Sequence, residues 1–270
     1  MKYKLLCIDI DGTLLDDNKK LLPQIVESLK KETEKGVKIA LISGRMPAGT
    51  NLIEQELGIQ CIKACNAGSY ILMGDQCISS RTLQPRTMKM IYYEIAKKNQ
   101  LPLWIFREEK WYVTDVDKQV EKEIEIIRYE PEVVDVEELA SRWEEEGAAP
   151  NKLLIAAEAD RIPALREEIR ALGLPDIDQA SSSDIFIEIF PHGVDKGEAL
   201  REICHKLDIR REEVVAFGDH QLDIPLIEAA GIGIAMGNAI PELKEKADFV
   251  TKTNNEAGIS YALEHYLAGE

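Results

Sequence analysis

The sequence lacks an excess of basic residues and lacks long apolar segments. Lys and Arg number 33 against 49 Asp and Glu, which gives the 270-residue chain a formal net charge of −16. This charge argues against a broad binding surface for nucleic acid or anionic lipid, because both need clustered Lys and Arg. No apolar run is long enough to span a membrane, and no secretory apolar region precedes the aspartate at position 9. We therefore expect a cytoplasmic protein that binds neither membrane nor nucleic acid. Any anionic substrate must then be bound by a local group of residues.

The chain also lacks paired cysteines, internal repeats and low-complexity segments. Its five cysteines are an odd number in mostly apolar segments, which predicts reduced, buried thiols. Cys61 and Cys65 have a spacing compatible with a soft metal, but no second Cys or His pair follows, and structural zinc sites usually take four ligands. The cysteines are thus interpreted as core residues, and the sequence carries no signal of an oligomeric state.

Both ends of the chain alternate between apolar strands and helices. "KLLCID", "VKIALIS", "EVVAFGD" and "IGIAM" have the continuous apolar character of buried strands. "PQIVESLKKETEKG" opens with Pro23 and closes at Gly36, as a helix does, and "EALREICHKLD" and "AGISYALEHYL" are also helical patterns. Buried strands separated by helices predict an α/β fold with a Rossmann-like, doubly wound parallel sheet covered on both faces.

The middle of the chain has a different pattern and holds most of the tryptophan and tyrosine. "PLWIFR" and "KWYVT" are separated by a short connection and predict a β-hairpin, and helical patterns surround them. We therefore predict two domains: residues 1–82 with 188–270 form an outer domain, and residues 83–187 form an α+β domain inserted into it.

Polar clusters follow the predicted strands of the outer domain, and loops at the carboxyl ends of parallel strands share one edge of the sheet. Each cluster alone has a plain structural explanation as a turn, a helix cap or a solvated side chain. Their joint occurrence at one edge predicts a common site. The clusters are Asp9 with Asp11, Ser43 with Gly44 and Arg45, Lys196, and Asp219 with Asp223.

The composition of these clusters predicts a metal and phosphate site. Asp9, Asp219 and Asp223 repel one another unless a hard cation lies among them, and oxygen ligands favour Mg²⁺, which is commonly shared with a substrate phosphate. Ser43, taken to stand at a helix start beside free backbone N–H groups, suits a phosphate oxygen, and Lys196 supplies a point charge for the same group.

The two acids of "DIDGT" are expected to have different roles. A carboxylate at Asp9 that is held against Mg²⁺ stays ionised and can attack phosphorus to give an aspartyl-phosphate. Asp11 lies further out, where the chain turns at Gly12, and can carry a proton to the leaving oxygen and later take one from water.

Four segments of the chain resemble, in order, the four motifs of the haloacid dehalogenase (HAD) superfamily of phosphatases. They are "DIDGTLL", "LISGR", "GVDKG" and "GDHQLDIPLIEAAGIGIAMGNA". The long insert between "CNAGSYI" and "DIFIEIFPHGVDKG" is similar to the larger α/β cap of the Cof-type branch. The resemblance implies Asp9 as nucleophile and Mg²⁺ ligand, and Asp11 as general acid/base that holds Mg²⁺ through its backbone carbonyl. It also implies Ser43 and Gly44 as phosphate binders, Lys196 as the charge clamp, Asp219 as a direct Mg²⁺ ligand and Asp223 as a supporting one.

Two positions depart from the family pattern. The last motif usually has the form Gly-Asp-x-x-Asn-Asp, and this chain has Leu222 at the Asn position, which removes a hydrogen-bonding side chain from the site. The usual Asn-Gly-Ala before the cap is here Asn66-Ala67-Gly68. Because every charged residue of the four motifs is present, we expect weakened rather than absent catalysis.

The sequence therefore predicts a Mg²⁺-dependent phosphatase that hydrolyses small phosphorylated metabolites, foremost sugar phosphates, through an aspartyl-phosphate. A phosphomutase or phosphotransferase is the first alternative, because only the acceptor of the phosphoryl group differs. A non-catalytic metabolite-binding protein is the second, motivated by Leu222. Aromatic residues of the cap are candidates for a wall over the leaving group, although a buried core role is favoured; they are Trp104, Phe106, Trp111 and Tyr112.

Overall fold

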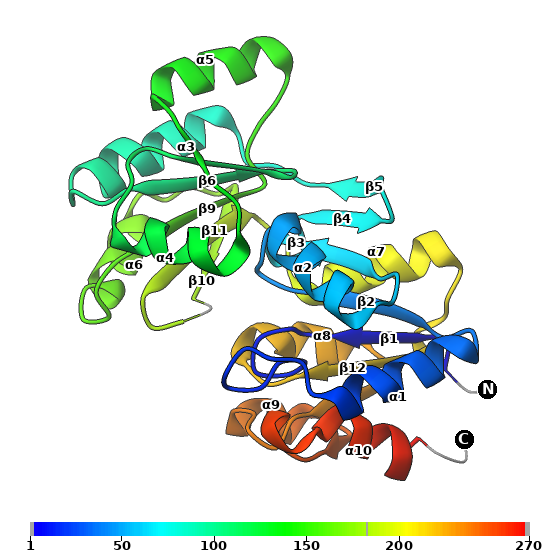
Figure 1. The fold of residues 1–270 in the computed structure, drawn as a ribbon. Coiled ribbons are helices and arrows are strands. Elements are labelled where there is room, and N and C mark those ends of the chain that lie inside the picture. The colour runs from blue at the N-terminus through cyan, green and yellow to red at the C-terminus, as the bar shows by residue number, and fades with distance from the viewer. Residues whose placement is uncertain (1–2, 182, 268–270) are drawn as a thin grey trace. The chain divides into compact units, whose positions relative to one another are not determined.

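The computed structural model describes residues 3–181 and 183–267, which form two compact units (Figure 1). Of these described residues, the first unit contains those within 1–43, 50–79 and 195–270, and the second contains those within 44–49 and 80–194. Each hydrophobic cluster of buried side chains lies within one of these units. Among the described residues, no helix is both long and apolar enough to cross a membrane.

The first unit is built on an eight-stranded sheet with the order β14-β13-β12-β1-β2-β3-β4-β5. The strands from β14 to β3 run parallel, and β4 runs antiparallel to β3. All four residues of the central strand β1 are buried, as a strand covered on both faces requires. The strands are β1 (Leu5–Ile8), β2 (Lys38–Ile42), β3 (Ile62–Cys65), β4 (Tyr70–Met73), β5 (Gln76–Ser80), β12 (Val214–Gly218), β13 (Ile232–Ala235) and β14 (Phe249–Val250).

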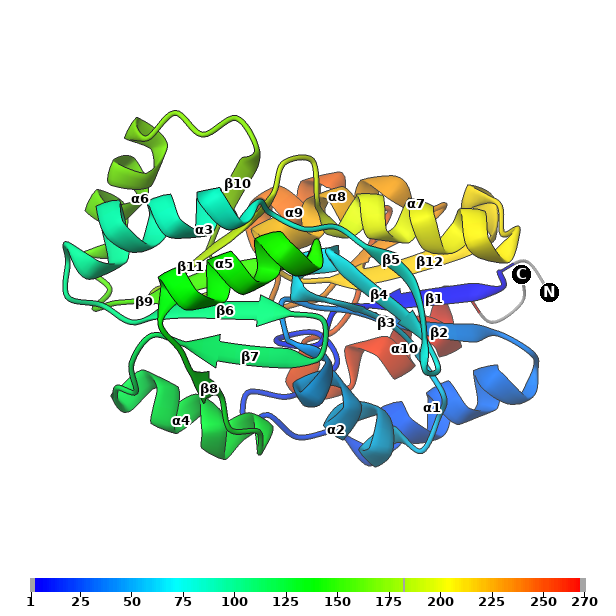
Figure 2. The same ribbon diagram turned by 90° about the horizontal axis from the view of Figure 1, so that it is seen from above.

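Helices cover both faces of this sheet: in Figure 2, α7 and α8 lie along one face, and α1 and α10 along the other. Helix α1 begins with Pro23, which needs no N–H partner there, and buries Ile25 and Leu29 against the sheet. The helices are α1 (Pro23–Glu34), α2 (Pro47–Leu57), α7 (Lys196–Leu207), α8 (Ile224–Ala229), α9 (Pro241–Lys246) and α10 (Gly258–His265), with short turns η1 (Asn66–Gly68), η3 (Arg211–Glu213), η4 (Gln221–Asp223) and η5 (Asn254–Glu256).

The second unit contains a six-stranded sheet with the order β10-β11-β9-β6-β7-β8, antiparallel except between β7 and β8. Alternate residues of β6 enter two clusters on opposite faces: Leu103 and Ile105 enter one, and Trp104 and Phe106 the other. Its elements are α3 (Pro85–Ile91), the π-helix η2 (Tyr92–Lys97), β6 (Leu103–Arg107), β7 (Lys110–Val113), α4 (Lys118–Ile127), β8 (Glu132–Val133), α5 (Val136–Glu146), β9 (Lys152–Ala156), α6 (Ile162–Ala171), β10 (Ile177–Ala180) and β11 (Phe186–Pro191).

The observed division of the chain differs from the predicted boundaries in three places. The second unit begins at residue 80 rather than at residue 83. The predicted boundary between residues 187 and 188 cuts β11, which pairs along its length with β9 and β10 and therefore belongs wholly to the second unit. The segment 44–49 was assigned to the first domain, but Met46 packs in the same cluster as Trp104 and Trp111 of the second unit.

Candidate active site

Four charged side chains meet at the carboxyl edge of the first unit's parallel sheet. Asp9 directly follows β1, Lys196 is the first residue of α7, and Asp219 and Asp223 follow β12. Lys196 Nζ lies 2.6 Å from Asp9 Oδ1 and 2.5 Å from Asp223 Oδ1, and the three side chains are buried. Residues separated by up to 214 positions in the chain thus form one cluster because their strands are neighbours in the sheet.

The three carboxylates of this cluster can hold a divalent cation. Asp9, Asp219 and Asp223 each offer an oxygen, and these oxygens lie within 4.8 Å of one another. Asp219 Oδ1 also accepts a hydrogen bond of 2.6 Å from the Thr13 hydroxyl. A side chain at Gly12 would place its Cβ 2.4 Å from Asp219 Oδ2, so the glycine is what lets this carboxylate approach the loop after β1. A set of carboxylate oxygens fits a hard cation such as Mg²⁺.

The electrostatics of the cluster also favour a cation. Burial, followed by repulsion from Asp223, raises the pKa of Asp9 well above its usual range despite the opposing charge of Lys196. Burial likewise raises the pKa of Asp219 to about 6, although the hydrogen bond from Thr13 opposes the shift. One ammonium cannot balance three carboxylates, so a bound divalent cation would relieve the remaining repulsion.

Asp223 connects the parts of the site through both of its oxygens. Oδ1 accepts the hydrogen bond from Lys196, and Oδ2 accepts from the backbone N–H groups of Asp219 and His220, each at 2.9 Å. The carboxylate therefore fixes the turn that carries Asp219 and orients the lysine.

For three further residues of the predicted site, the structure shows contacts other than those of the charged cluster. The Asp11 carboxylate is partly exposed and pairs with Lys19 Nζ at 2.8 Å. Asp11 is thus more exposed than the buried Asp9, as expected for the outer of the two acids. Ser43 is buried at the end of β2, and Gly44 groups with the second unit, where its carbonyl accepts a hydrogen bond from Lys152 Nζ at 2.6 Å.

The expectation that Ser43 stands at a helix start is wrong. Helix α2 begins four residues later, at Pro47, and the Ser43 N–H donates to the Ala64 carbonyl at 2.9 Å. The last pair of the β2–β3 ladder is Ile42 with Ala64, and the Ser43 N–H donates to Ala64 one residue beyond it, so this donor is already used within the first unit.

Residues 6–263 match the family of haloacid dehalogenase-like hydrolases. The chain belongs to this family. It is 30% identical to "Putative phosphatase YkrA" of Bacillus subtilis over 97% of both chains. It is 26% identical to the 5-amino-6-(5-phospho-D-ribitylamino)uracil phosphatase YwtE of the same organism over 99% of both. The solved structure of the HAD subclass IIB sugar phosphatase BT4131 superposes with a TM-score of 0.82 at 25% identity, covering 97% of this chain and 98% of that one.

These likenesses confirm the predicted HAD superfamily and Cof-type branch, the α/β fold with a parallel sheet, and the class of enzyme, a phosphoric monoester hydrolase. HAD phosphatases use a divalent metal ion, and the acidic cluster of this chain supplies suitable ligands. The hydrolase therefore has both the family's fold and a donor set that fits the family's cofactor.

The surroundings of Leu222 and of the hairpin's aromatic residues can now be described for this HAD hydrolase. Leu222 lies in η4, partly exposed and next to Asp223 in the chain. The aromatic residues of the hairpin are buried core residues: Trp104 and Trp111 pack 5.1 Å apart between ring centres, and Tyr112 packs on the opposite face of the sheet against Trp143.

Sequence reasoning gave no role in the site to two residues of this region: Thr13, and Asn66, which it named only as part of a departure from the family pattern. Thr13 is buried and holds Asp219, and its position two residues after Asp11 was the available signal. Asn66 directly follows β3, and recognising "IKAC" as the next parallel strand would have placed it at the same edge as Asp9 and Ser43.

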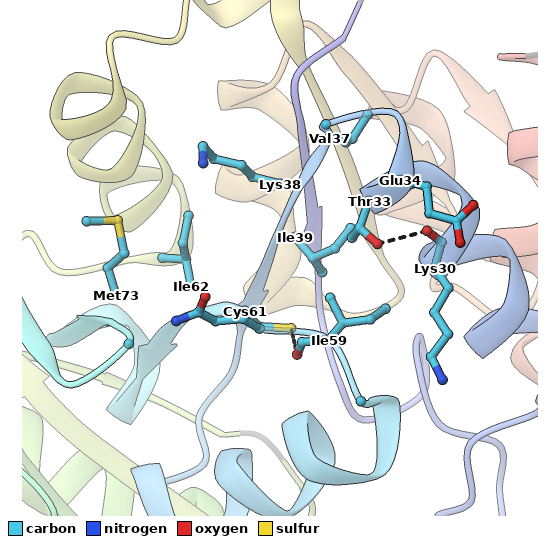
Figure 3. A pocket seen from close by; sticks show the side chains of 14 residues that line it. Lys30, Thr33, Glu34, Val37, Lys38, Ile39, Ile59, Cys61, Ile62 and Met73 are labelled. Carbon is cyan, nitrogen blue, oxygen red and sulfur yellow. Dashed lines mark hydrogen bonds between the residues drawn. The ribbon is translucent and has the colours of Figure 1, made fainter.

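A hollow of about 660 Å³ lies at the opposite edge of the sheet (Figure 3). Lys38 and Ile62, which line it, are the first residues of the parallel strands β2 and β3, whereas the charged cluster follows the last residues of the strands. Cys61 in its wall donates to the Ile59 carbonyl, and Thr33 to the Lys30 carbonyl. This hollow is therefore separate from the active site of the hydrolase.

Proposed function

We propose that the protein is a Mg²⁺-dependent phosphatase that hydrolyses small phosphorylated metabolites, foremost sugar phosphates, through an aspartyl-phosphate on Asp9. The observation that carries this proposal is the buried cluster of Asp9, Asp219, Asp223 and Lys196 at the carboxyl edge of the sheet. The Mg²⁺ would be held by the carboxylates of Asp9 and Asp219 and by the backbone carbonyl of Asp11. The Asp223 carboxylate would support it. When bound, Mg²⁺ would neutralise charge on the phosphoryl oxygens and on the carboxylates.

In the first half-reaction, a carboxylate oxygen of Asp9 attacks phosphorus and forms a phosphorus–oxygen bond as the bond to the substrate's alkoxide oxygen breaks. Asp11 donates its proton to that oxygen, and the alcohol leaves. In the second half-reaction, Asp11 takes a proton from water, whose oxygen attacks phosphorus and releases inorganic phosphate with Asp9 regenerated. Lys196, Ser43 and Gly44 bind the phosphoryl group, and Lys196 offsets charge that increases in the transition state.

The outward position of Asp11 supports its proposed role. Its carboxylate is 38% exposed and lies outside the cluster that would surround a cation. A carboxyl group with access to water can exchange its proton between the two half-reactions, which a buried metal ligand cannot do readily. Lys19, which pairs with it in the free protein, would release it when a leaving group approaches.

The proposed substrates are phosphate esters of small polyhydroxylated compounds. One similar protein is named a sugar phosphatase and another a 5-amino-6-(5-phospho-D-ribitylamino)uracil phosphatase. Sugars and ribityl groups both carry several hydroxyl groups. The second unit, predicted as a cap of residues 83–187, would choose the organic part of the substrate. A cytoplasmic location remains a prediction.

Phosphate release from a panel of phosphorylated metabolites, with Mg²⁺ and with chelator, tests the proposal. We expect release from sugar phosphates that requires Mg²⁺, and its loss in Asp9→Asn without a change in the circular dichroism spectrum. Turnover that persists in Asp9→Asn would exclude the covalent mechanism. Phosphoryl transfer with little free phosphate would support a phosphotransferase, and ligand-dependent thermal stabilisation without any turnover would support a binding protein.

A further inference from the structure

Three successive residues after β3 have a left-handed backbone. Asn66, Ala67 and Gly68 have φ values of 52°, 63° and 99°. Only the last is a glycine. Asparagine tolerates the left-handed region better than most residues, so the cost in folding free energy is smaller at Asn66 and larger at Ala67. Residues in such conformations persist where surrounding contacts impose them, and they are common at functional sites.

Contacts from two elements of the active site impose this conformation. The Ala67 N–H donates to the Ser43 carbonyl at 3.1 Å, at the end of β2. On the other side, a Cβ on Gly68 would lie 3.1 Å from the Asp195 carbonyl oxygen and 3.0 Å from Ala199 Cβ, at the start of α7. The turn is therefore wedged between the residues that precede Gly44 and the residues that surround Lys196.

The side chain of Asn66 is enclosed and has no partner. Its exposed fraction is 0%, and among the described residues neither Nδ2 nor Oδ1 has a hydrogen-bond partner. Buried amides are ordinarily paired, because an unpaired one loses its hydrogen bonds to water without replacement. Asn66 thus combines an unfavourable backbone with an unsatisfied side chain, and neither feature stabilises the fold.

We propose that Asn66 is a further substrate-binding residue, whose Nδ2 donates a hydrogen bond to the phosphoryl group when the site is loaded. The inference rests on the proposed function, because it assigns the ligand from the phosphate roles of Ser43 and Lys196. The amide is already removed from water, so a phosphoryl oxygen that reaches it displaces no water hydrogen bond. Loading must first move the groups that enclose the amide, and the contact is then made in a water-excluded site, where such bonds are strongest.

The test compares two variants that differ only in whether they remove the amide. Asn66→Gly removes it and suits a φ of 52°, whereas Ala67→Gly gives the neighbouring residue the same backbone freedom and removes only a methyl group. We expect Asn66→Gly to lower kcat/KM for the best substrate 10- to 100-fold and to keep or raise the thermal unfolding midpoint. Ala67→Gly should stay within twofold of the parent. Asn66→Asp, which repels phosphate, should lose more activity than Asn66→Gly.

Binding of inorganic phosphate with Mg²⁺, measured by calorimetry, separates this inference from the proposed function. Parent-like kcat/KM and parent-like phosphate affinity in Asn66→Gly would overturn the inference and leave the phosphatase proposal intact. A lower unfolding midpoint that accounts for the lost activity would also overturn it, because it indicates a structural role. If the parent has no phosphatase activity, the proposed function fails, and weaker phosphate binding by Asn66→Gly still supports the inference. If the parent binds no phosphate, both fail.

Discussion

At the scale of single residues, Lys196 stabilises the charged cluster in addition to its proposed role in binding substrate. Burial lowers the stability of its ammonium, but Asp223 and Asp9 outweigh this effect and raise the pKa of Lys196 above its usual range. In Lys196→Met the two carboxylates would face each other without a counter-charge. Removing one partner of a buried ion pair costs about 3–5 kcal/mol. We therefore expect the free energy of unfolding in chelator, measured by urea denaturation, to fall by about 3 kcal/mol, with loss of phosphate release.

A double variant separates the two effects of this substitution. Adding Asp223→Asn to Lys196→Met removes one of the opposed charges, so part of the lost stability should return while activity stays absent. If the double variant is no more stable than Lys196→Met, repulsion between Asp9 and Asp223 is not the source of the loss.

Leu222 offers a gain-of-function prediction. Restoring an amide next to Asp223 in Leu222→Asn should raise kcat/KM, because a hydrogen bond regained in a closed site contributes about 1–3 kcal/mol, roughly 5- to 150-fold in rate. Steady-state phosphate release measures the change. Gln221→Asn, one residue earlier in the same turn and exposed, is the matched control and should leave the rate unchanged. An unchanged or lower rate in Leu222→Asn would mean that the turn has adapted to the leucine.

The charged residues of the site were predictable because each directly follows or begins a strongly patterned element. Asp9 and Asp219 end buried apolar strands, and Lys196 begins a helix, so the parallel topology alone brings them to one edge. The two hydrogen bonds that Asp223 Oδ2 accepts from the backbone depend on the geometry of a tight turn, and no spacing rule predicts them.

At the scale of elements, the strands that sequence reasoning missed carry polar residues for reasons visible only in three dimensions. Lys63 lies in the middle of β3 and is buried, because its ammonium pairs with Glu54 of α2 at 2.6 Å. The edge strand β10 is only half-buried and has the composition "IDQA", which lacks both alternation and a continuous apolar run. By contrast, the hairpin of β6 and β7 was predicted from its apolar and aromatic residues and is confirmed.

Glu213 connects the starts of two neighbouring strands and makes stability depend on pH. Hydrogen bonds from Lys4, before β1, and from Arg210 lower the pKa of Glu213 to about 2. A carboxyl with a depressed pKa in the folded state stabilises fully above its ordinary pKa and loses that contribution as pH falls toward the folded-state value. We therefore expect Glu213→Gln to be less stable than the parent at pH 6, with a difference that shrinks between about pH 4.5 and pH 2.

Urea denaturation at several pH values measures this difference. The control is Glu212→Gln, since the Glu212 side chain is 65% exposed and pairs with the exposed Arg210 side chain. A difference between Glu213→Gln and the parent that is constant from pH 6 to pH 2.5 would show that the hydrogen bonds act independently of charge.

At the scale of the whole molecule, the existence of a second domain was predictable and its limits were not. The change from alternating strands and helices to an aromatic hairpin marks the insertion. The segment 44–49, however, joins the second unit through the packing of Met46 and the hydrogen bond from Lys152 to the Gly44 carbonyl. Contacts between residues so far apart in sequence leave no local pattern.

The separate hydrophobic clusters of the two units predict that the units can be destabilised one at a time. The three tryptophans, Trp104, Trp111 and Trp143, are all buried in the second unit, so their fluorescence reports that unit, whereas far-ultraviolet circular dichroism reports both. Leu5 in β1 and Leu153 in β9 are matched probes, since each is a fully buried strand leucine in a different cluster. Removing a buried leucine side chain costs about 2–5 kcal/mol.

In thermal unfolding we therefore expect Leu153→Ala to lower the midpoint followed by tryptophan fluorescence, and Leu5→Ala to lower only a transition followed by circular dichroism. The proposed ligands of Mg²⁺ all lie in the first unit. Adding Mg²⁺ should therefore raise the thermal midpoint followed by circular dichroism and restore part of the midpoint that Leu5→Ala loses. It should leave the fluorescence midpoint of Leu153→Ala unchanged. Equal shifts of both signals in both variants would mean that the units unfold as one cooperative structure. Among the described residues, the members of each hydrophobic cluster belong to a single unit, and independent transitions are therefore the expected result.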